Sequence, residues 1–293
     1  MARRQARGGL RAPLRTDRRA VSGVVAAALG VVLISILLTM VVTFWVPAWG
    51  YDNEVEHARD VLGAFGDFKS SVEIRAVQGS TNQTVTSSVP LGVGAVPLFG
   101  AETQGQLSYR YLEGDTPRFE ARITDSGGSV NLSAAGALRY EIVNRYYDPQ
   151  TYSYESGAVV LDQREGAAVR LPPAFSISNT TGGVLVSLTL VTLEGEARTL
   201  TGVEPRTITS RVTVAHAQEF AWPAGTVLSF EVWTWYPSAW ARYFNDTAAS
   251  AGLPEGASEV TTTGLEAPWR VALILEGVSQ LAVTSALVQV QLD

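Results

Sequence analysis

The sequence predicts a mainly β protein, in which an N-terminal transmembrane helix is followed by a β-sandwich-like domain with one short covering helix. Three observations lead to this fold class. No charged residue lies between Ala20 and Tyr51, apolar and polar residues alternate in many short segments further along, and residues 236–253 carry apolar side chains at helical spacing. The expected organisation is a basic leader at 1–20, a hydrophobic helix at 21–46, a juxtamembrane stalk at 47–68 and an extracellular β-rich domain at 69–293.

The membrane assignment rests on length and flanking charge. The apolar stretch Val21–Val46 has 26 residues, which is about 39 Å of helix, whereas a bilayer core of about 30 Å needs about 20 residues. It is also longer than the apolar region of a typical secretory signal. Seven arginines precede it, and Asp52, Glu54 and Glu56 follow it. The positive-inside rule therefore predicts a single-pass protein of the cell membrane with a cytoplasmic N terminus and an extracellular C-terminal domain. Four aromatic residues are expected at the outer interface: Phe44, Trp45, Trp49 and Tyr51.

Three interpretations of the arginines stay open: charge that sets the topology, a twin-arginine export signal at Arg18-Arg19, and a prepilin processing site. The segment Arg19-Ala20-Val21-Ser22-Gly23-Val24-Val25 resembles the leader junction (class III signal peptide) of archaeal type IV pilin-like proteins and archaellins. This resemblance covers about residues 15–46. It implies cleavage between Ala20 and Val21 by a prepilin peptidase that reads Arg18, Arg19, Ala20 and Val21. Gly23 stands where those pilins often have Pro.

Small residues in the apolar helix are candidates for helix packing. Gly23 and Ala27 form one i, i+4 pair, and Ala26 and Gly30 form another, which would let neighbouring helices approach closely in a filament core. Removal of the leader would also remove the charge that holds the helix in the membrane. The alternative is that these residues reflect only the ordinary composition of membrane helices.

The stalk and the domain differ in their periodicity. Pro47 is expected to end or kink the first helix, and Val55, Ala58, Leu62 and Phe65 share one face of a short second helix. Period-two alternation then predicts strands separated by turns, which is typical of a β-sandwich. The predicted strands lie at 71–77, 106–112, 118–124, 129–134, 138–143, 157–162, 184–193, 207–215, 226–235, 269–276 and 280–292, with a turn at 125–128.

The single helix expected within the domain covers residues 236–253. Ser238 is the predicted N-cap, and Gly252 is the predicted stop. Trp240, Phe244 and Ala248 form an apolar stripe at helical spacing. We expect this helix to cover an edge or an end of a sheet.

A tyrosine-rich stretch, residues 139–166, allows two interpretations. Its five closely spaced tyrosines suit either an aromatic surface for a sugar or a neighbouring subunit, or the half-buried positions of strands and loops, and we favour the second. The phrase also resembles one in uncharacterised archaeal pilin-like proteins. These tyrosines are Tyr140, Tyr146, Tyr147, Tyr152 and Tyr154.

The sequence offers little catalytic chemistry. There is no cysteine, there are only two histidines (His57 and His216), and no nucleophile elbow, phosphate-binding loop or metal-binding motif occurs. We therefore expect no enzymatic activity, no cofactor and no metal. An acidic pair such as Glu255 and Glu259 leaves an extracellular hydrolase as an alternative. The chain carries a net charge of −6, and residues 1–19 hold seven arginines and one acid. The remainder is therefore acidic, with 15 basic and 27 acidic residues, and this argues against nucleic acid as a partner.

Four N-x-[ST] sequons lie on the side predicted to be extracellular, and they predict a glycoprotein. They begin at Asn82, Asn131, Asn179 and Asn245. The resulting prediction is a pilin-like cell-surface structural protein that is displayed in or with a type IV pilus-like filament, as a minor subunit or an accessory protein. Its predicted partners are the membrane, a prepilin peptidase and other pilin-like subunits or a surface layer. The alternative is an uncleaved anchored protein that associates with a surface layer or binds a ligand.

Overall fold

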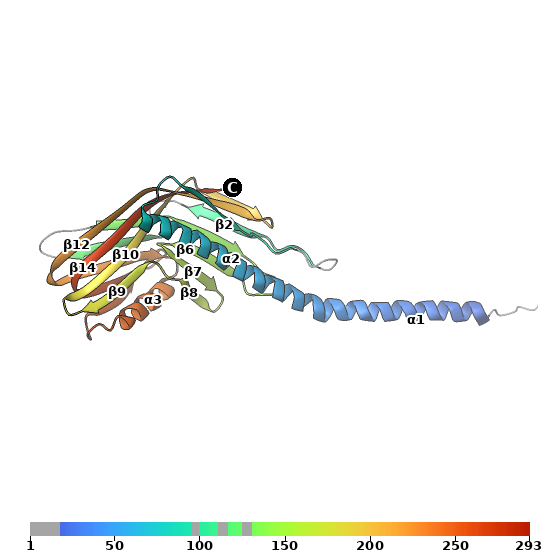
Figure 1. Cartoon of the computed structure of the whole chain (residues 1–293). Helices are drawn as coiled ribbons and strands as arrows, with labels where there is room; N and C mark the ends of the chain where they lie inside the picture. The colour runs from blue at the N-terminus through green and yellow to red at the C-terminus, as the bar shows by residue number, and fades with distance from the viewer. Residues whose placement is uncertain (1–17, 95–99, 111–116, 125–130) are drawn as a thin grey trace, which may run out of the picture. The chain divides into compact units, whose positions relative to one another are not determined.

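The computed structural model describes residues 18–94, 100–110, 117–124 and 131–293 (Figure 1). The chain divides into two compact units, residues 1–48 and 49–293. Helical structure comes first, as α1 (Arg18–Met40), the π-helical turn η1 (Val41–Trp45) and α2 (Val46–Gln78). The other elements are β1 (Thr84–Val89), β2 (Gly105–Arg110), β3 (Arg118–Thr124), β4 (Asn131–Ala135), β5 (Ala137–Ile142), β6 (Gln150–Glu155), β7 (Ala158–Gln163), β8 (Gly166–Leu171), β9 (Phe175–Thr180), β10 (Gly183–Glu194), β11 (Arg198–Gly202), β12 (Arg206–Thr234), α3 (Pro237–Ser250), β13 (Ser258–Thr263) and β14 (Trp269–Leu292).

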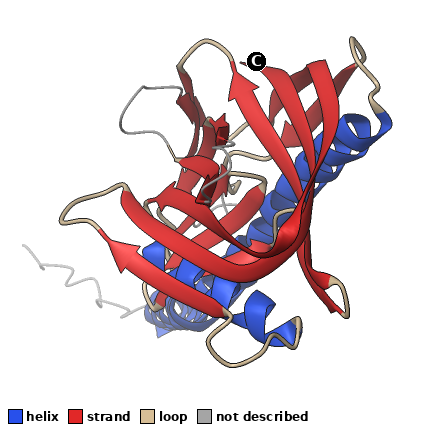
Figure 2. Cartoon of the chain, turned by 90° about the vertical axis from the view of Figure 1, so that its left-hand side faces the viewer, coloured by secondary structure: helices blue, strands red, loops and turns tan. Residues whose placement is uncertain are grey.

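The predicted fold class is confirmed, because the second unit is built from two β-sheets. The first sheet has eight strands in the order β4-β3-β12-β14-β10-β9, with β1 paired to β12 and β13 paired to β14. The second sheet has six strands in the order β11-β2-β5-β6-β7-β8. Pairing is antiparallel throughout the described strands except between β10 and β14. Figure 2 shows the long strands of the first sheet curving across the unit.

Two pairs of predicted strands are in fact single long strands. The segments 207–215 and 226–235 belong to the 29-residue β12, and 269–276 and 280–292 belong to the 24-residue β14. The segments between the predicted strands are irregularities in the pairing of β12 with β14 and are not turns. The register of this pairing shifts between Ala221 and Thr226. Gly277 lies opposite this irregularity with φ = 75°, a conformation that glycine adopts without steric cost.

Pro47 does not end the helical structure. The N–H of Val46 donates to the carbonyl of Val41, five residues back, as in a π-helix. This wide turn, η1, ends at Trp45, two residues before Pro47. Pro47 has no N–H to donate to Thr43, and a π-helical turn changes the spacing of donors and acceptors at the point where the regular ladder is interrupted. Helical structure continues from Pro47 to Gln78.

The predicted strand at 71–77 is wrong, and the predicted stalk at 47–68 is part of a longer helix. Val72 and Ala76 are buried, but so are Phe65 and Phe68, and together they follow a helical spacing on α2. Ile74, which a strand would bury beside them, is 55% exposed. The period-two pattern is thus the C-terminal end of an amphipathic helical stripe, and the β-rich structure begins only at β1.

The remaining predicted elements agree closely with the structure. Strands lie at the other predicted positions, and the structure adds β1, β6, β8, β9, β11 and β13. The predicted turn at 125–128 lies outside the described residues. Helix α3 is confirmed, with Trp240, Phe244 and Ala248 buried and Gly252 following its end at φ = 62°. Ser238 is not its N-cap: the helix begins after Tyr236 with Pro237 in its first turn, and no side chain caps it.

Two large hydrophobic cores hold the second unit together. The first lies between the buried face of α2, the six-stranded sheet and one half of the eight-stranded sheet, with Phe68, Tyr140 and Val288 as members from each. The second joins α3 to the other half of the eight-stranded sheet through Trp240 and Phe230. Helix α3 therefore covers the sheet as predicted, while α2 supplies a buried helix that the sequence reading placed outside the domain.

Candidate functional site

The most apolar surface of the molecule belongs to helical residues 22–45. Their side chains are exposed on all sides of the helix, from Val24 (70% exposed) to Phe44 (68% exposed), apart from the half-buried Val41. A helix that is apolar all round fits a membrane interior or the centre of a helical assembly. Among the described residues, one helix is long and apolar enough to cross a membrane: Ser22–Gln78, with a mean hydropathy of 2.8 in its most apolar part.

The predicted processing and packing residues lie in this helix. Arg18, Arg19, Ala20 and Val21 form the first turn of α1. The predicted packing positions Gly23, Ala26, Ala27 and Gly30 are exposed, and a Cβ built on Gly23 or Gly30 meets no atom within 4 Å. These small residues are therefore available to another helix or to lipid.

The four sequons are at the surface, but they are not brought together. Asn82 lies in the turn before β1, Asn131 begins β4, Asn179 is in β9 and Asn245 is in α3, and all four are exposed. The side-chain amide of Asn179 donates to the carbonyl of Gly252 at 2.9 Å. Exposure satisfies the first requirement for attachment of a sugar at each position.

The first turns of α2 hold a buried carboxylate that the sequence reading assigned to the charged flank. Glu54 is buried, and its two oxygens accept hydrogen bonds from three successive backbone N–H groups, those of Arg145 (2.9 Å), Tyr146 (2.7 Å) and Tyr147 (2.6 Å). Consecutive N–H groups that converge in this way form an anion-binding nest. A signal was present in the sequence, since Glu54 precedes Ala58 and Val61 on the face that α2 buries.

A buried polar chain lies next to this nest. The Nε2 of His57 donates to the hydroxyl of Tyr140 at 2.7 Å, and that hydroxyl donates to the carbonyl of Leu91 at 2.5 Å. Burial lowers the pKa of His57, against the raising effect of Asp60 and Glu54. Burial also raises the pKa of Tyr140, and Tyr152 adds to that effect. His57 is thus held by the fold, as expected of a structural histidine.

The tyrosine-rich stretch belongs mainly to the core, as the favoured interpretation predicts. Tyr140, Tyr152 and Tyr154 are buried, and Tyr146 and Tyr147 are half-buried. The Tyr152 hydroxyl donates to the carbonyl of Ala58 at 2.9 Å. Helix α2 therefore docks onto the six-stranded sheet largely through tyrosines.

A second buried carboxylate, Glu155, connects the two layers at the opposite end of β6. Its Oε1 accepts hydrogen bonds from the Thr234 hydroxyl and from Trp240 Nε1, the latter at 2.6 Å. The described residues offer its Oε2 no hydrogen-bond partner. Burial raises the pKa of Glu155 to about 7, against the opposing effects of the hydrogen bonds from Thr234 and Trp240 and the charge of Arg139. No sequence signal pointed to this residue.

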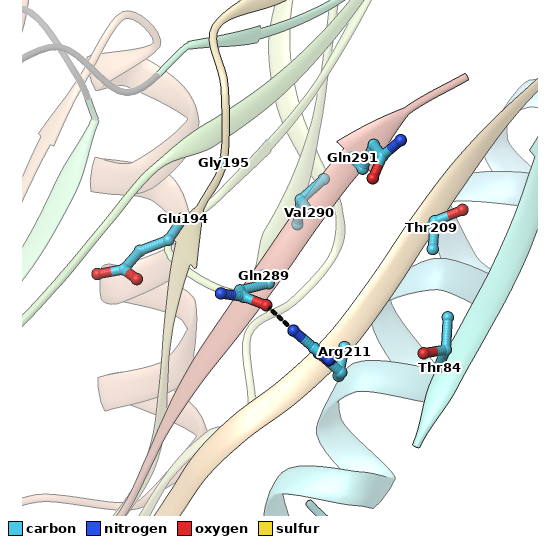
Figure 3. A pocket seen from close by; sticks show the side chains of 8 residues that line it. All are labelled: Thr84, Glu194, Gly195, Thr209, Arg211, Gln289, Val290 and Gln291. Carbon is cyan, nitrogen blue, oxygen red and sulfur yellow. Dashed lines mark hydrogen bonds between the residues drawn. The ribbon is translucent and has the colours of Figure 1, made fainter. Parts of the chain in front are cut away.

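One groove is prominent on the described surface, with a volume of about 530 Å³ (Figure 3). Arg211 donates to the side-chain carbonyl of Gln289 across two neighbouring strands, and Glu194 lies apart from this pair. The groove has one carboxylate and one cation, so it has the means to hydrogen-bond a polar ligand but not to perform paired-carboxylate chemistry. Its lining consists of Thr84, Glu194, Gly195, Thr209, Arg211, Gln289, Val290 and Gln291.

Within the described ranges, no three His, Cys, Asp or Glu side chains come together in an arrangement that would hold a metal ion. His216 is an exposed residue of β12, and Glu255 and Glu259 are exposed.

Comparison with known proteins gives a family and no activity. No curated protein and no solved structure matches this chain. A family model described as "Family of unknown function (DUF7289)" matches residues 19–290. The match begins at Arg19 and includes the apolar helix and nearly all of the β-rich unit. The chain therefore belongs to this family of unknown function.

Proposed function

We propose that the chain is a membrane-anchored, pilin-like structural protein of the cell surface. In this proposal residues 1–20 are a cytoplasmic leader, residues 21–46 first span the membrane, and the β-rich unit lies outside the cell. The single observation that carries the proposal is the exposure of the apolar residues 22–45 on all sides of a helix. A surface of this kind needs lipid or other apolar helices around it.

The energy of insertion supports the membrane part of the proposal. Fifteen of the residues between Val21 and Val46 are Val, Ile, Leu or Phe, and at about −0.3 to −0.6 kcal/mol each they contribute roughly −5 to −9 kcal/mol. Two hydroxyls within the stretch are satisfied by the helix itself, since Ser35 donates to the Val31 carbonyl and Thr39 to that of Ser35. The seven arginines of the leader favour its retention in the cytoplasm.

The pilin-like part rests on the leader and on the small residues. The resemblance at Arg19-Ala20-Val21 implies cleavage by a prepilin peptidase, which would remove the basic anchor charge. The exposed positions Gly23 and Gly30 would then allow close approach of helices from other copies. Sugars on the exposed sequons would add bulk and solubility to the outer surface.

The test is the N terminus of the mature protein, measured by mass spectrometry on membranes and on sheared surface material. The proposal expects a start at Val21, and it expects Arg19→Ala to abolish this start. The matched control is Arg15→Ala, which removes the same charge outside the junction. A start at Met1 or Ala2 in the native protein would refute processing and leave an uncleaved anchored protein.

A further inference from the structure

We propose that the loop between β5 and β6, residues 143–149, is a lipid-contacting surface that rests on the phospholipid headgroups beside the membrane span. The proposal builds on the membrane anchoring proposed above. It adds a second point of contact with the bilayer, supplied by the β-rich unit rather than by the apolar helix.

The first step is that the loop is fixed to the beginning of α2. Three of its backbone N–H groups, at residues 145–147, donate to the carboxylate of Glu54. Hydrogen bonds to a charged acceptor are among the stronger ones in proteins. Because Glu54 is buried, the loop and the helix form one rigid corner of the unit.

Side-chain packing strengthens this attachment. The ring of Tyr146 lies directly against Gly50, where a Cβ would come within 2.2 Å of the ring carbon Cδ2. The rings of Tyr51 and Tyr147 meet edge to face, with centroids 5.4 Å apart. Glycine at position 50 is therefore what allows a tyrosine of the loop to reach the helix backbone.

The second step is that the corner cannot lie far from the bilayer. Gly50 is four residues from Val46, the last residue of the apolar stretch, and four residues span at most about 14 Å even when fully extended. In a helix the same four residues rise only about 6 Å. The polar headgroup layer on each side of the hydrocarbon core is roughly 5–8 Å thick. Because Val46 and Gly50 belong to the same helix α2, the ring of Tyr146, which lies against Gly50, is within reach of the headgroups.

The third step is the chemistry of the exposed side chains. Arg145 is exposed, and its guanidinium lies 5.4 Å from the centre of the Tyr146 ring. Tyrosine is enriched at membrane interfaces because its ring is apolar and its hydroxyl is polar, and the arginine fork binds phosphate oxygens. The exposed carboxylates Asp52 and Glu56 on α2 offset the charge of Arg145, so the long-range attraction between the loop and lipid phosphates is weak. The contact is therefore a local one, in which Arg145, Tyr146 and Tyr147 of the loop meet a lipid phosphate.

The absence of cysteine from the chain allows a direct test on the full-length protein. Single-cysteine variants Val143→Cys, Ser178→Cys and Leu37→Cys are labelled with a nitroxide and reconstituted into phosphatidylcholine vesicles that contain a nickel-chelating lipid. Val143 is 76% exposed in the same loop, and a label there leaves Arg145, Tyr146 and Tyr147 and their bonds to Glu54 in place. The exposed Ser178 of β9 is the matched control in the same unit, and Leu37 reports on the apolar helix.

We expect the headgroup-bound nickel to enhance spin relaxation several-fold more at position 143 than at 178, while the label at 37 is protected from water-soluble nickel and accessible to oxygen. Glu54→Gln added to Val143→Cys should lower the enhancement, because it weakens the attachment of the loop. Equal relaxation at 143 and 178, with position 37 buried in lipid, would overturn the loop contact and leave the anchor intact. Water access at position 37 would instead overturn the anchor, and the loop contact with it.

Discussion

Replacement of Glu155 by Gln should stabilise the protein at neutral and alkaline pH. Glu155 lies at the end of β6, where its Oε1 receives hydrogen bonds from β12 and α3, and where Oε2 has no partner among the described residues. A buried carboxylate without full hydrogen bonding is costly to ionise. Glutamine retains the shape and the accepting oxygen of the protonated acid, and it carries no charge.

The magnitude follows from the shift of the pKa, which burial raises from 4.5 to about 7 in the folded state. Below about pH 4.5 the carboxyl is protonated in both the folded and the unfolded chain, and it leaves the free energy of unfolding unaffected. Between pH 4.5 and pH 7 the unfolded chain loses the proton while the folded chain keeps it, so stability falls as pH rises. A difference of this size corresponds to roughly 3 kcal/mol above pH 7.

The assay is urea unfolding of the full-length chain in detergent, followed by tryptophan fluorescence at several pH values. The free energy of unfolding of Glu155→Gln minus that of the wild type should be near zero at pH 4.5 and approach roughly 3 kcal/mol at pH 8. The matched control is Glu255→Gln, the same chemical change at an exposed loop position, which should shift stability little. A difference that does not vary between pH 4.5 and pH 8 would refute the claim that folded Glu155 holds a proton.

Three further substitutions can be tested by the same unfolding assay. Gly63→Ala should stabilise by about 1 kcal/mol, because Gly63 is exposed in the interior of α2 and a Cβ there meets nothing within 4 Å. Gly105→Ala should destabilise by about 1–3 kcal/mol, because its Cβ would come within 1.9 Å of the Leu91 carbonyl oxygen; equal effects of the two glycine changes would contradict this packing. Tyr140→Phe should destabilise by about 1–3 kcal/mol, since it leaves the buried His57 Nε2 and the Leu91 carbonyl unpaired; an unchanged stability would mean that water replaces the hydroxyl.

Much of the fold was predictable because its strands carry the period-two pattern on single faces. Strand β3, for example, was predicted at 118–124 from alternation alone, and it buries the alternate residues Phe119 and Ala121. The pattern failed at residues 71–77, where a short helical stripe also places apolar residues two apart. Phe68 and Phe65 are buried one and two turns before Val72, and Ile74 is exposed. These observations distinguish a helix from a strand here, and only a sequence window that extends back to residue 65 would have included the two phenylalanines.

The candidate site was less predictable, because its key groups act through partners distant in sequence. In the sequence Glu54 is one of the charged residues that follow the apolar stretch. In the structure it accepts hydrogen bonds from three N–H groups of a loop about ninety positions away. Glu155 carries no local signal at all, and its environment is created by Thr234 and Trp240 from the other layer. The leader, the apolar helix and the sequons are recognisable from local sequence, whereas these buried carboxylates become visible only when the sheets are assembled.

The two units are stabilised in different ways, so a substitution that tests processing of the N-terminal segment can be separated from one that tests folding of the β-rich unit. Residues 22–45 are apolar all round and have no core of their own, whereas residues 49–293 contain two cores, the first of which includes α2 from Val61 onwards. A change in the leader, such as Arg19→Ala, should therefore alter processing without altering the unfolding of the β-rich unit. A change at Glu54 should do the reverse, because its partners all lie within that unit. If Arg19→Ala lowered the stability of the β-rich unit, the independence of the two units would be wrong, and a loss of surface display could no longer be assigned to the missing cleavage.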